Sequence, residues 1–226
     1  MAALSAETIA VGDTHQVSVL LQMPARATAC FVLAHGAGAG MRHAFLEATA
    51  NGLAERGIAT LRYQFPYMES GSKRPDPPAL CHATVRAAVA EAARRAPSLP
   101  LIAGGKSFGG RMTTQAQATA PLPGVVGLAF IGFPLHPPKR PSDERAEHLS
   151  KVHVPMLFLQ GTRDEFAEPQ LLEPLIARLA DRATLKSFPD ADHSFHVRAR
   201  SGRTDAQTFN ELLEELAGWI GTTLQK

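Results

Sequence analysis

The sequence predicts an α/β fold: a mostly parallel, doubly wound sheet with helices on both faces and an antiparallel hairpin at the N-terminus. Short apolar runs alternate with helix-compatible segments along almost the whole chain. Several of these runs are apolar without interruption, as in strands buried on both faces. The 226 residues, of which 45% are hydrophobic, suffice for one well-filled core, so we expect a single domain over residues 1–226.

The first elements are expected to be two strands, residues 7–11 and 16–22, joined by a Gly-Asp turn. In the second strand apolar residues alternate with polar ones, which suits the edge of a sheet. Residues 29–34 (ACFVLA) form a continuous apolar run typical of a buried parallel strand. These segments predict a hairpin followed by the first central strand.

The rest of the chain alternates between helix and strand. Further strands are expected at residues 58–63, 101–103, 125–131, 155–160 and 184–188, and helices at 42–56, 84–96, 111–119, 169–179 and 206–224. The last helix has a single apolar stripe along its length. Residues 64–78 and 132–147 are rich in proline and are expected to be loops.

A Gly-x-Ser-x-Gly turn connects the strand at 101–103 to the helix at 111–119. Ser107 lies at its apex between Gly105 and Gly109. A serine held there in a strained backbone conformation exposes its hydroxyl, and glycine is needed on both sides because strand and helix nearly touch. The turn therefore predicts Ser107 as a nucleophile.

Two further loops at the carboxyl ends of strands supply an acid and a histidine. Asp164 follows the strand at 155–160 through a Gly-Thr turn, and His193 follows the last strand. The order serine, acid, histidine is the one expected for this type of elbow. His193 would take the proton of Ser107, and Asp164 would hold the imidazole in the required tautomer. The competing carboxylates are Glu165, Glu168, Asp190 and Asp192.

The loop that follows the strand at 29–34, HGAGAG, is built of small residues. Its Ala37 N–H group, together with that of Phe108 directly after the nucleophile, is expected to form an oxyanion hole. His35 in this loop is expected to be structural. Lys106 is adjacent to Ser107 in sequence, but neighbouring side chains of so tight a turn point apart, so we expect a structural or surface role for it.

Six segments, HGAGAGMRHAFL, RYQFPYM, GGKSFGGRM, FPLHPP, QGTRDEF and DADHSFHV, resemble those of a bacterial branch of α/β-hydrolases with kinship to dienelactone-hydrolase-like proteins. The resemblance covers nearly the whole chain and implies the α/β-hydrolase fold and a serine-hydrolase triad, but no particular substrate. Dienelactone hydrolases have cysteine, and haloalkane dehalogenases aspartate, where this chain has Ser107, so both chemistries are disfavoured. Many α/β-hydrolases insert a cap domain where this chain has its proline-rich segment 132–147, so we expect no cap and an open, shallow site.

Several residues on loops at the same edge are candidates for substrate binding. Arg42, His43 and Arg111 would bind an anionic group, with ordinary surface pairing as the alternative. Aromatic and methionine side chains would line an acyl pocket, although any of them could instead belong to the core: Phe65, Tyr67, Met68, Phe133 and Phe166.

The composition of the chain limits which kinds of partner are expected. Lysine plus arginine (23) nearly balances aspartate plus glutamate (21), and no basic run is interleaved with aromatics, so we expect no nucleic-acid partner. Cys30 and Cys81 have no metal-ligand spacing, and we expect neither a metal nor a cofactor. The N-terminal segment lacks a leader pattern and no segment is long and apolar enough for a membrane, so we expect a cytoplasmic protein, a monomer or homodimer.

These features together predict a serine hydrolase that cleaves a small carboxylic ester or thioester through an acyl-enzyme on Ser107. An amidase or peptidase with the same triad is the alternative among enzymes. A non-catalytic scaffold that retains the fold is the alternative of another class.

Overall fold

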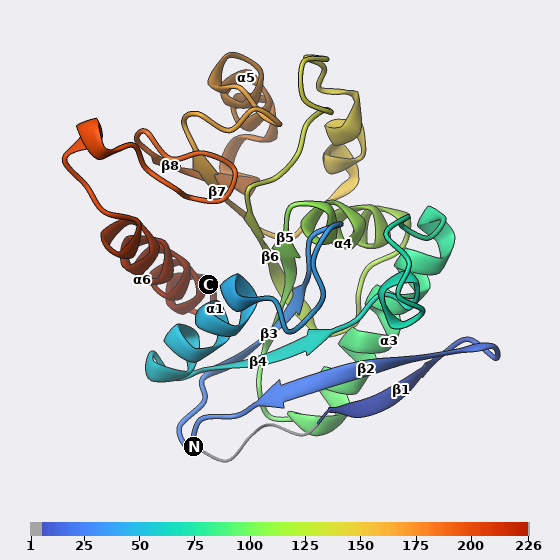
Figure 1. The fold of residues 1–226 in the computed structure, drawn as a ribbon. Coiled ribbons are helices and arrows are strands. Elements are labelled where there is room, and N and C mark those ends of the chain that lie inside the picture. The colour runs from blue at the N-terminus through green and yellow to red at the C-terminus, as the bar shows by residue number, and fades with distance from the viewer. Residues whose placement is uncertain (1–5, 226) are drawn as a thin grey trace.

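A computed structural model describes residues 6–225 and contains one eight-stranded sheet with helices on both faces (Figure 1). The strand order is β1-β2-β4-β3-β5-β6-β7-β8. β1 and β2 form the antiparallel hairpin, β2 pairs antiparallel with β4, and every later pairing is parallel. The predicted fold class is confirmed. Residues 1–5, the start of the segment expected to carry no leader, lie outside the described residues.

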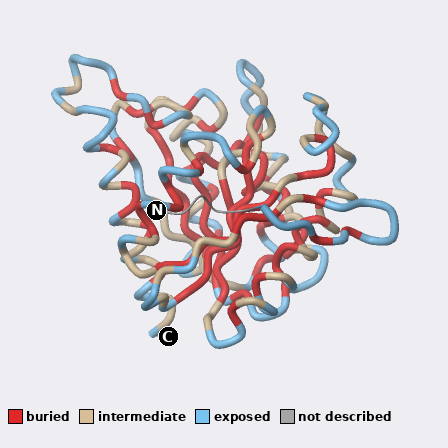
Figure 2. The backbone as a smooth tube through the Cα atoms, turned by 60° about the horizontal axis from the view of Figure 1, so that its bottom comes forward, coloured by how far each residue is buried: buried red, intermediate tan, exposed pale blue. Residues whose placement is uncertain are grey.

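The strands lie close to their expected positions. Their bounds are β1 Glu7–Val11, β2 His15–Gln22, β3 Ala29–Ala34, β4 Ile58–Tyr63, β5 Leu101–Lys106, β6 Val125–Ile131, β7 Met156–Gly161 and β8 Ala183–Phe188. All six residues of β3 are buried, as its continuous apolar run requires. All six residues of β4 are buried as well, although Thr60 and Arg62 are polar. Figure 2 shows that the buried backbone is concentrated in the middle of the molecule. β5 runs three residues further than the apolar run 101–103, because its small and polar residues continue to pair with β6 up to Lys106.

Helices form a layer on each face of the sheet. α1 (Ala44–Glu55) and α6 (Asp205–Thr223) pack together on one face (Figure 1). The other face carries α3 (Pro78–Arg95), α4 (Phe108–Thr119) and α5 (Pro169–Leu179), whose buried residues join the opposite core cluster. The apolar stripe predicted for the last helix is the face that α6 turns to the sheet, since its leucines and Ile220 are buried there.

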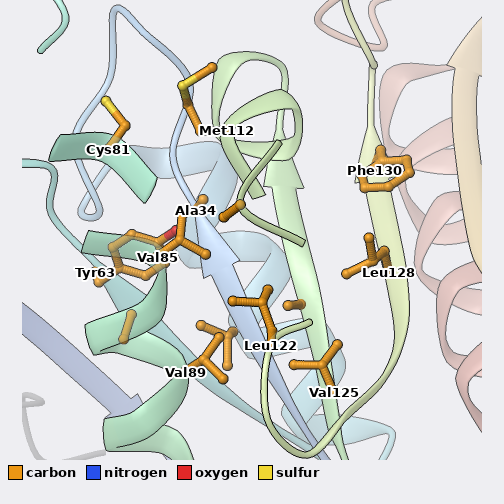
Figure 3. Close-up of a cluster of buried hydrophobic side chains, with 14 of the residues drawn as sticks. Ala34, Tyr63, Cys81, Val85, Val89, Met112, Leu122, Val125, Leu128 and Phe130 are labelled. Atoms are coloured by element: carbon orange, nitrogen blue, oxygen red, sulfur yellow. The ribbon is translucent and has the colours of Figure 1, made fainter. Parts of the chain in front are cut away.

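The two layers share the side chains of each central strand. In β3, Phe31 and Leu33 belong to the cluster beneath α1 and α6, whereas Val32 and Ala34 belong to the cluster beneath α3 and α4. Figure 3 shows part of the second cluster, in which Val85 of α3 reaches toward the sheet. Each large apolar side chain buried in this way contributes about 1.5–3 kcal/mol, so both faces stabilise the position of the strand ends.

Helical residues also occur in two segments expected to be loops. α2 (Pro66–Glu69) lies within 64–78, and α3 starts at Pro78, six residues before the predicted start at 84. Both helices have proline in their first turn, where its missing N–H costs no hydrogen bond. A 3-10 helix, η1 (Glu144–Lys151), occupies the end of the segment 132–147. The prolines at the starts of α2 and α3 therefore begin helices, whereas the proline-rich composition indicates loops.

The parallel strands β3, β5, β7 and β8 end at one edge of the sheet, where functional loops of α/β folds collect. The segment between β6 and β7 contains no element other than η1, which packs on α4. This short connection is the place where a cap domain would be inserted. None of the helices in the described part of the chain is both long enough and apolar enough to cross a membrane.

Candidate active site

Ser107 lies at the end of β5 and directly precedes α4. Its backbone has φ 51° and ψ −118°, in the region that non-glycine residues rarely occupy. A Cβ on Gly105 would lie 2.3 Å from the Ala34 carbonyl oxygen, and one on Gly109 would lie 2.5 Å from that of His35. Strand and helix thus approach β3 too closely for any side chain, which explains the two glycines around the serine.

Ser107, His193 and Asp164 form a continuous chain of hydrogen bonds. The Ser107 Oγ lies 2.9 Å from His193 Nε2, and His193 Nδ1 lies 2.7 Å from Asp164 Oδ2. An ionised carboxylate can only accept, so Nδ1–H donates to Asp164 and Nε2 is left to accept the serine proton. The Asp164 side chain is fully buried, whereas that of His193 is 20% exposed.

The carboxylate of Asp164 accepts two further hydrogen bonds. Gln160 Nε2 donates to Oδ2 over 2.5 Å, and the Phe166 N–H donates to Oδ1 over 2.9 Å. Gln160 is itself buried and held through its Oε1 by the Phe133 N–H. These donors satisfy a buried charge and orient it toward His193. The sequence pattern indicated Asp164 but not Gln160, because Gln160 lies in a strand that is otherwise apolar and carries no motif.

The neighbouring acid Asp192 has a different function. Its Oδ1 accepts from the N–H groups of Ser194 and His196 and so closes the turn that carries His193. Asp192 is thus a turn-forming residue.

The loop after β3 holds an N–H group close to Ser107. His35 is buried, donates from Nδ1 to the Gly36 carbonyl over 2.8 Å and accepts from the Phe65 N–H at Nε2 over 3.0 Å. Because a trans peptide directs its C=O and N–H oppositely, the bond to Gly36 O turns the Ala37 N–H away from His35. Burial lowers the pKa of His35 to about 4, so it stays neutral at neutral pH.

The other predicted donor is the Phe108 N–H in the first turn of α4. Within residues 6–225, neither this N–H nor that of Ala37 has a hydrogen-bond partner. The hydroxyl of Tyr67 donates to the Ala37 carbonyl over 2.9 Å and steadies the loop. Two free donors and a helix N-terminus beside Ser107 suit an anionic oxygen.

Lys106 is half-buried beside the site. Its Nζ donates to the main-chain oxygen of His193 and lies 5.5 Å from the ring centre of Phe195. Burial lowers the pKa of its ammonium group to about 8, against the opposing effect of Asp164 and Asp192. It thus ties the elbow to the histidine loop, a role that its sequence position beside Ser107 does not reveal.

Two cavities flank Ser107. The first, of about 410 Å³, is lined by the loop 36–39, by Phe45 and Leu46 of α1, and by His193. The second, of about 420 Å³, lies against α4 and η1 and is lined by Phe108, Arg111 and Arg145 among others. Ser107, Ala37 and Phe166 belong to both linings. A substrate with its reacting carbon at Ser107 can therefore extend in two directions.

The structure brings only part of the predicted substrate-binding set to these cavities. His43 lines the first cavity, Arg111 the second and Phe166 both. Arg42 is exposed and lines neither.

The remaining predicted lining residues are structural. Phe133 is wholly buried against Phe130 and Phe158 and lines neither cavity, which agrees with the alternative of a core role. Tyr67 and Met68 likewise lie outside both linings: Tyr67 is buried in the core, and the half-buried Met68 packs against it. Arg145, which does line a cavity, was missed since it lies in a segment expected to be loop.

The chain is similar to known hydrolases in sequence and in fold. Residues 27–221 match the model of a family described as an alpha/beta hydrolase domain. An α/β serine hydrolase without a lid from Xanthomonas campestris is 22% identical, with a TM-score of 0.72 over 100% of this chain and 95% of that chain. A dienelactone hydrolase from Anabaena variabilis is 20% identical, with a TM-score of 0.76 over 97% of each chain.

A third similar structure is Est1E from Butyrivibrio proteoclasticus with ferulic acid bound. It is 15% identical and covers 97% of this chain and 100% of that chain, with a TM-score of 0.71. At these identities the likeness concerns the fold.

Proposed function

Because the chain belongs to this alpha/beta hydrolase family, we propose that it is a serine hydrolase that cleaves a small carboxylic ester or thioester. The observation that carries the proposal is the hydrogen-bonded chain from Asp164 through His193 to Ser107, beside two N–H groups that have no partner among residues 6–225. Serine, base, orienting acid and oxyanion donors are the groups that acyl transfer requires.

In the first half of the reaction Ser107 Oγ attacks the carbonyl carbon while His193 Nε2 takes the hydroxyl proton. The carbonyl oxygen becomes an oxyanion, which the Ala37 and Phe108 N–H groups bind. Asp164 stabilises the resulting imidazolium through Nδ1–H. His193 then returns the proton to the leaving alcohol or thiol, and an acyl-enzyme remains.

Water completes the cycle. His193 takes a proton from water as its oxygen attacks the acyl carbon, and the same N–H groups bind the second oxyanion. Collapse of this intermediate breaks the bond to Ser107 Oγ, which recovers its proton from His193. The carboxylic acid leaves, and the two steps together consume only the ester and one water molecule.

The size of the substrate is inferred from the cavities. Each has a volume of about 410–420 Å³, and the connection between β6 and β7 adds no cap over them. Short acyl and alcohol groups fit such volumes. The ferulic acid bound to Est1E is a carboxylic acid of comparable scale in a protein of the same fold, which supports a small ester as substrate.

The test is covalent labelling with a fluorophosphonate probe, read as intact-protein mass. We expect one adduct on the native protein and none on Ser107→Ala or His193→Ala. Ser194→Ala is the matched control, because Ser194 is an exposed serine that lines the first cavity, and its adduct should persist. Absence of an adduct on the folded native protein would refute the proposal in favour of a non-catalytic fold.

A further inference from the structure

The cavity between α4 and η1 has a cationic end and an apolar floor. Arg111 comes from the first turn of α4 and Arg145 from η1, and the two elements pack together. Phe108 and Met112 line the same cavity, and the Arg111 guanidinium lies 5.7 Å from the Phe108 ring centre. Ser107 lies in the lining as well, so the charges face the reacting atom across apolar surface.

Neither guanidinium group has an anionic partner among the described residues. No ion pair of Arg111 or Arg145 occurs in the part of the chain that the structure describes, and the buried Nε of Arg111 has no hydrogen-bond partner. Burial lowers the pKa of Arg111, and the charge of Arg145 lowers it further. Two cations held near one another without a counter-charge favour an anionic ligand.

The other titratable groups around the cavity leave this excess of positive charge in place. The Asp76 carboxylate also lines the cavity, but its Oδ2 accepts the Tyr67 N–H, and it pairs with neither arginine. His148 lies beside Arg111, and burial together with that charge lowers its pKa to about 4. His82 is shifted in the same direction, mainly by burial. The lowered pKa values favour the neutral form of both histidines, so neither one offsets the positive charge of the arginines.

The position of His193 decides which half of the substrate enters this cavity. The imidazole protonates the leaving group, so the leaving group must lie on its side, in the first cavity, whose lining includes His193. The second cavity does not have His193 in its lining and is left for the acyl group. Arg111 follows Ser107 by four residues at the start of α4, and four helical residues span about 6 Å of axis, which matches a chain of four to six carbons.

We propose that this cavity is an acyl subsite for a short acyl chain that ends in a carboxylate, which Arg111 and Arg145 bind. The substrate class is thus the half-ester or half-thioester of a short dicarboxylic acid. This inference rests on the proposed function, since it presumes an acyl-enzyme on Ser107.

The experiment compares two esters with one leaving group: 4-nitrophenyl butyrate, which is neutral, and mono-4-nitrophenyl glutarate, which carries the carboxylate. We expect the native protein to favour the glutarate at least tenfold in kcat/KM. In Arg145→Gln and Arg111→Gln the ratio of the two values should fall at least tenfold. Arg145→Gln carries little folding risk, because the half-exposed side chain makes no hydrogen bond in the described residues. Arg26→Gln, an exposed site remote from both cavities, removes the same charge and should leave the ratio unchanged.

Two results would overturn the subsite while leaving the proposed function intact: turnover of both esters without preference, or a ratio that the arginine variants do not change. A preference only for a carboxylate on the leaving alcohol, as in 3-carboxyphenyl butyrate over phenyl butyrate, would overturn the acyl assignment. Absence of turnover of every ester, together with no fluorophosphonate adduct, would overturn the proposed function and the subsite together.

Discussion

Replacing Asp164 by asparagine separates the charge of this residue from its shape. The carboxylate receives His193 Nδ1–H and Gln160 Nε2 at Oδ2, and the Phe166 N–H at Oδ1. All three partners are donors, whereas an amide offers only one acceptor atom. Whichever way the amide is turned, its NH₂ group must face at least one of these donors.

The least costly solution is for His193 to change tautomer and accept from the amide at Nδ1. Nε2 then carries the proton and cannot accept that of Ser107. We expect kcat to fall about ten-thousand-fold, the effect that the same change has in serine proteases, or about 5 kcal/mol of transition-state stabilisation. The unfolding free energy should fall by only about 1–3 kcal/mol, the cost of an unsatisfied buried donor.

The assay is single-turnover and steady-state hydrolysis of 4-nitrophenyl butyrate at neutral pH, with thermal unfolding as the measure of folding. Asp192→Asn is the control, since it makes the same isosteric change beside His193. The Oδ1 that accepts two backbone N–H groups is retained there, so only a few-fold effect is expected. A folded Asp164→Asn protein with more than a tenth of native kcat would refute the orienting role of the carboxylate.

Three further variants test other parts of the site. Lys106→Met should lower kcat about 10–100-fold with KM little changed, because the hydrogen bond from Lys106 to the histidine loop is lost. The lowered pKa of Lys106 makes the unfolded state bind more protons than the folded state between pH 8 and 10, so the unfolding free energy of the native protein should rise over this range. In the variant this rise should be absent. His35→Phe should lower kcat by loosening the Ala37 N–H, yet unfolding curves should show a smaller loss of stability between pH 6.5 and 4, where only the unfolded native chain protonates this histidine. Gly109→Ala should lower the unfolding free energy by more than about 3 kcal/mol in denaturant titration, because its Cβ would lie 2.5 Å from a carbonyl oxygen. Native-like stability of that variant would contradict the close approach of α4 to β3.

Local patterns in the sequence suffice for most of the fold. The run ACFVLA coincides with β3, and the stripe predicted for residues 206–224 coincides with α6 Asp205–Thr223. The first signal arises from burial of both faces of a strand, and the second from burial that repeats with the period of a helix. The start of α3 at Pro78 could not be read in this way, because a proline in the first turn of a helix and a proline in a loop look alike.

The order of residues along the chain is enough to predict which groups meet at the strand ends. Gly105, Ser107 and Gly109 specify the turn locally, and parallel strands must bring the loops with Asp164 and His193 to the same edge. The order of the residues and the direction of the strands were enough for this.

The further side chains that reach those groups depend on how the elements pack together. Gln160 holds Asp164, Lys106 holds the histidine loop, and Arg145 joins Arg111, whereas Phe133 turns into the core. Each of these contacts joins segments whose relative position depends on packing between elements, such as η1 against α4. Periodicity and motif spacing describe one helix, strand or turn at a time. A cavity is lined by several elements, so its lining cannot be read from these patterns.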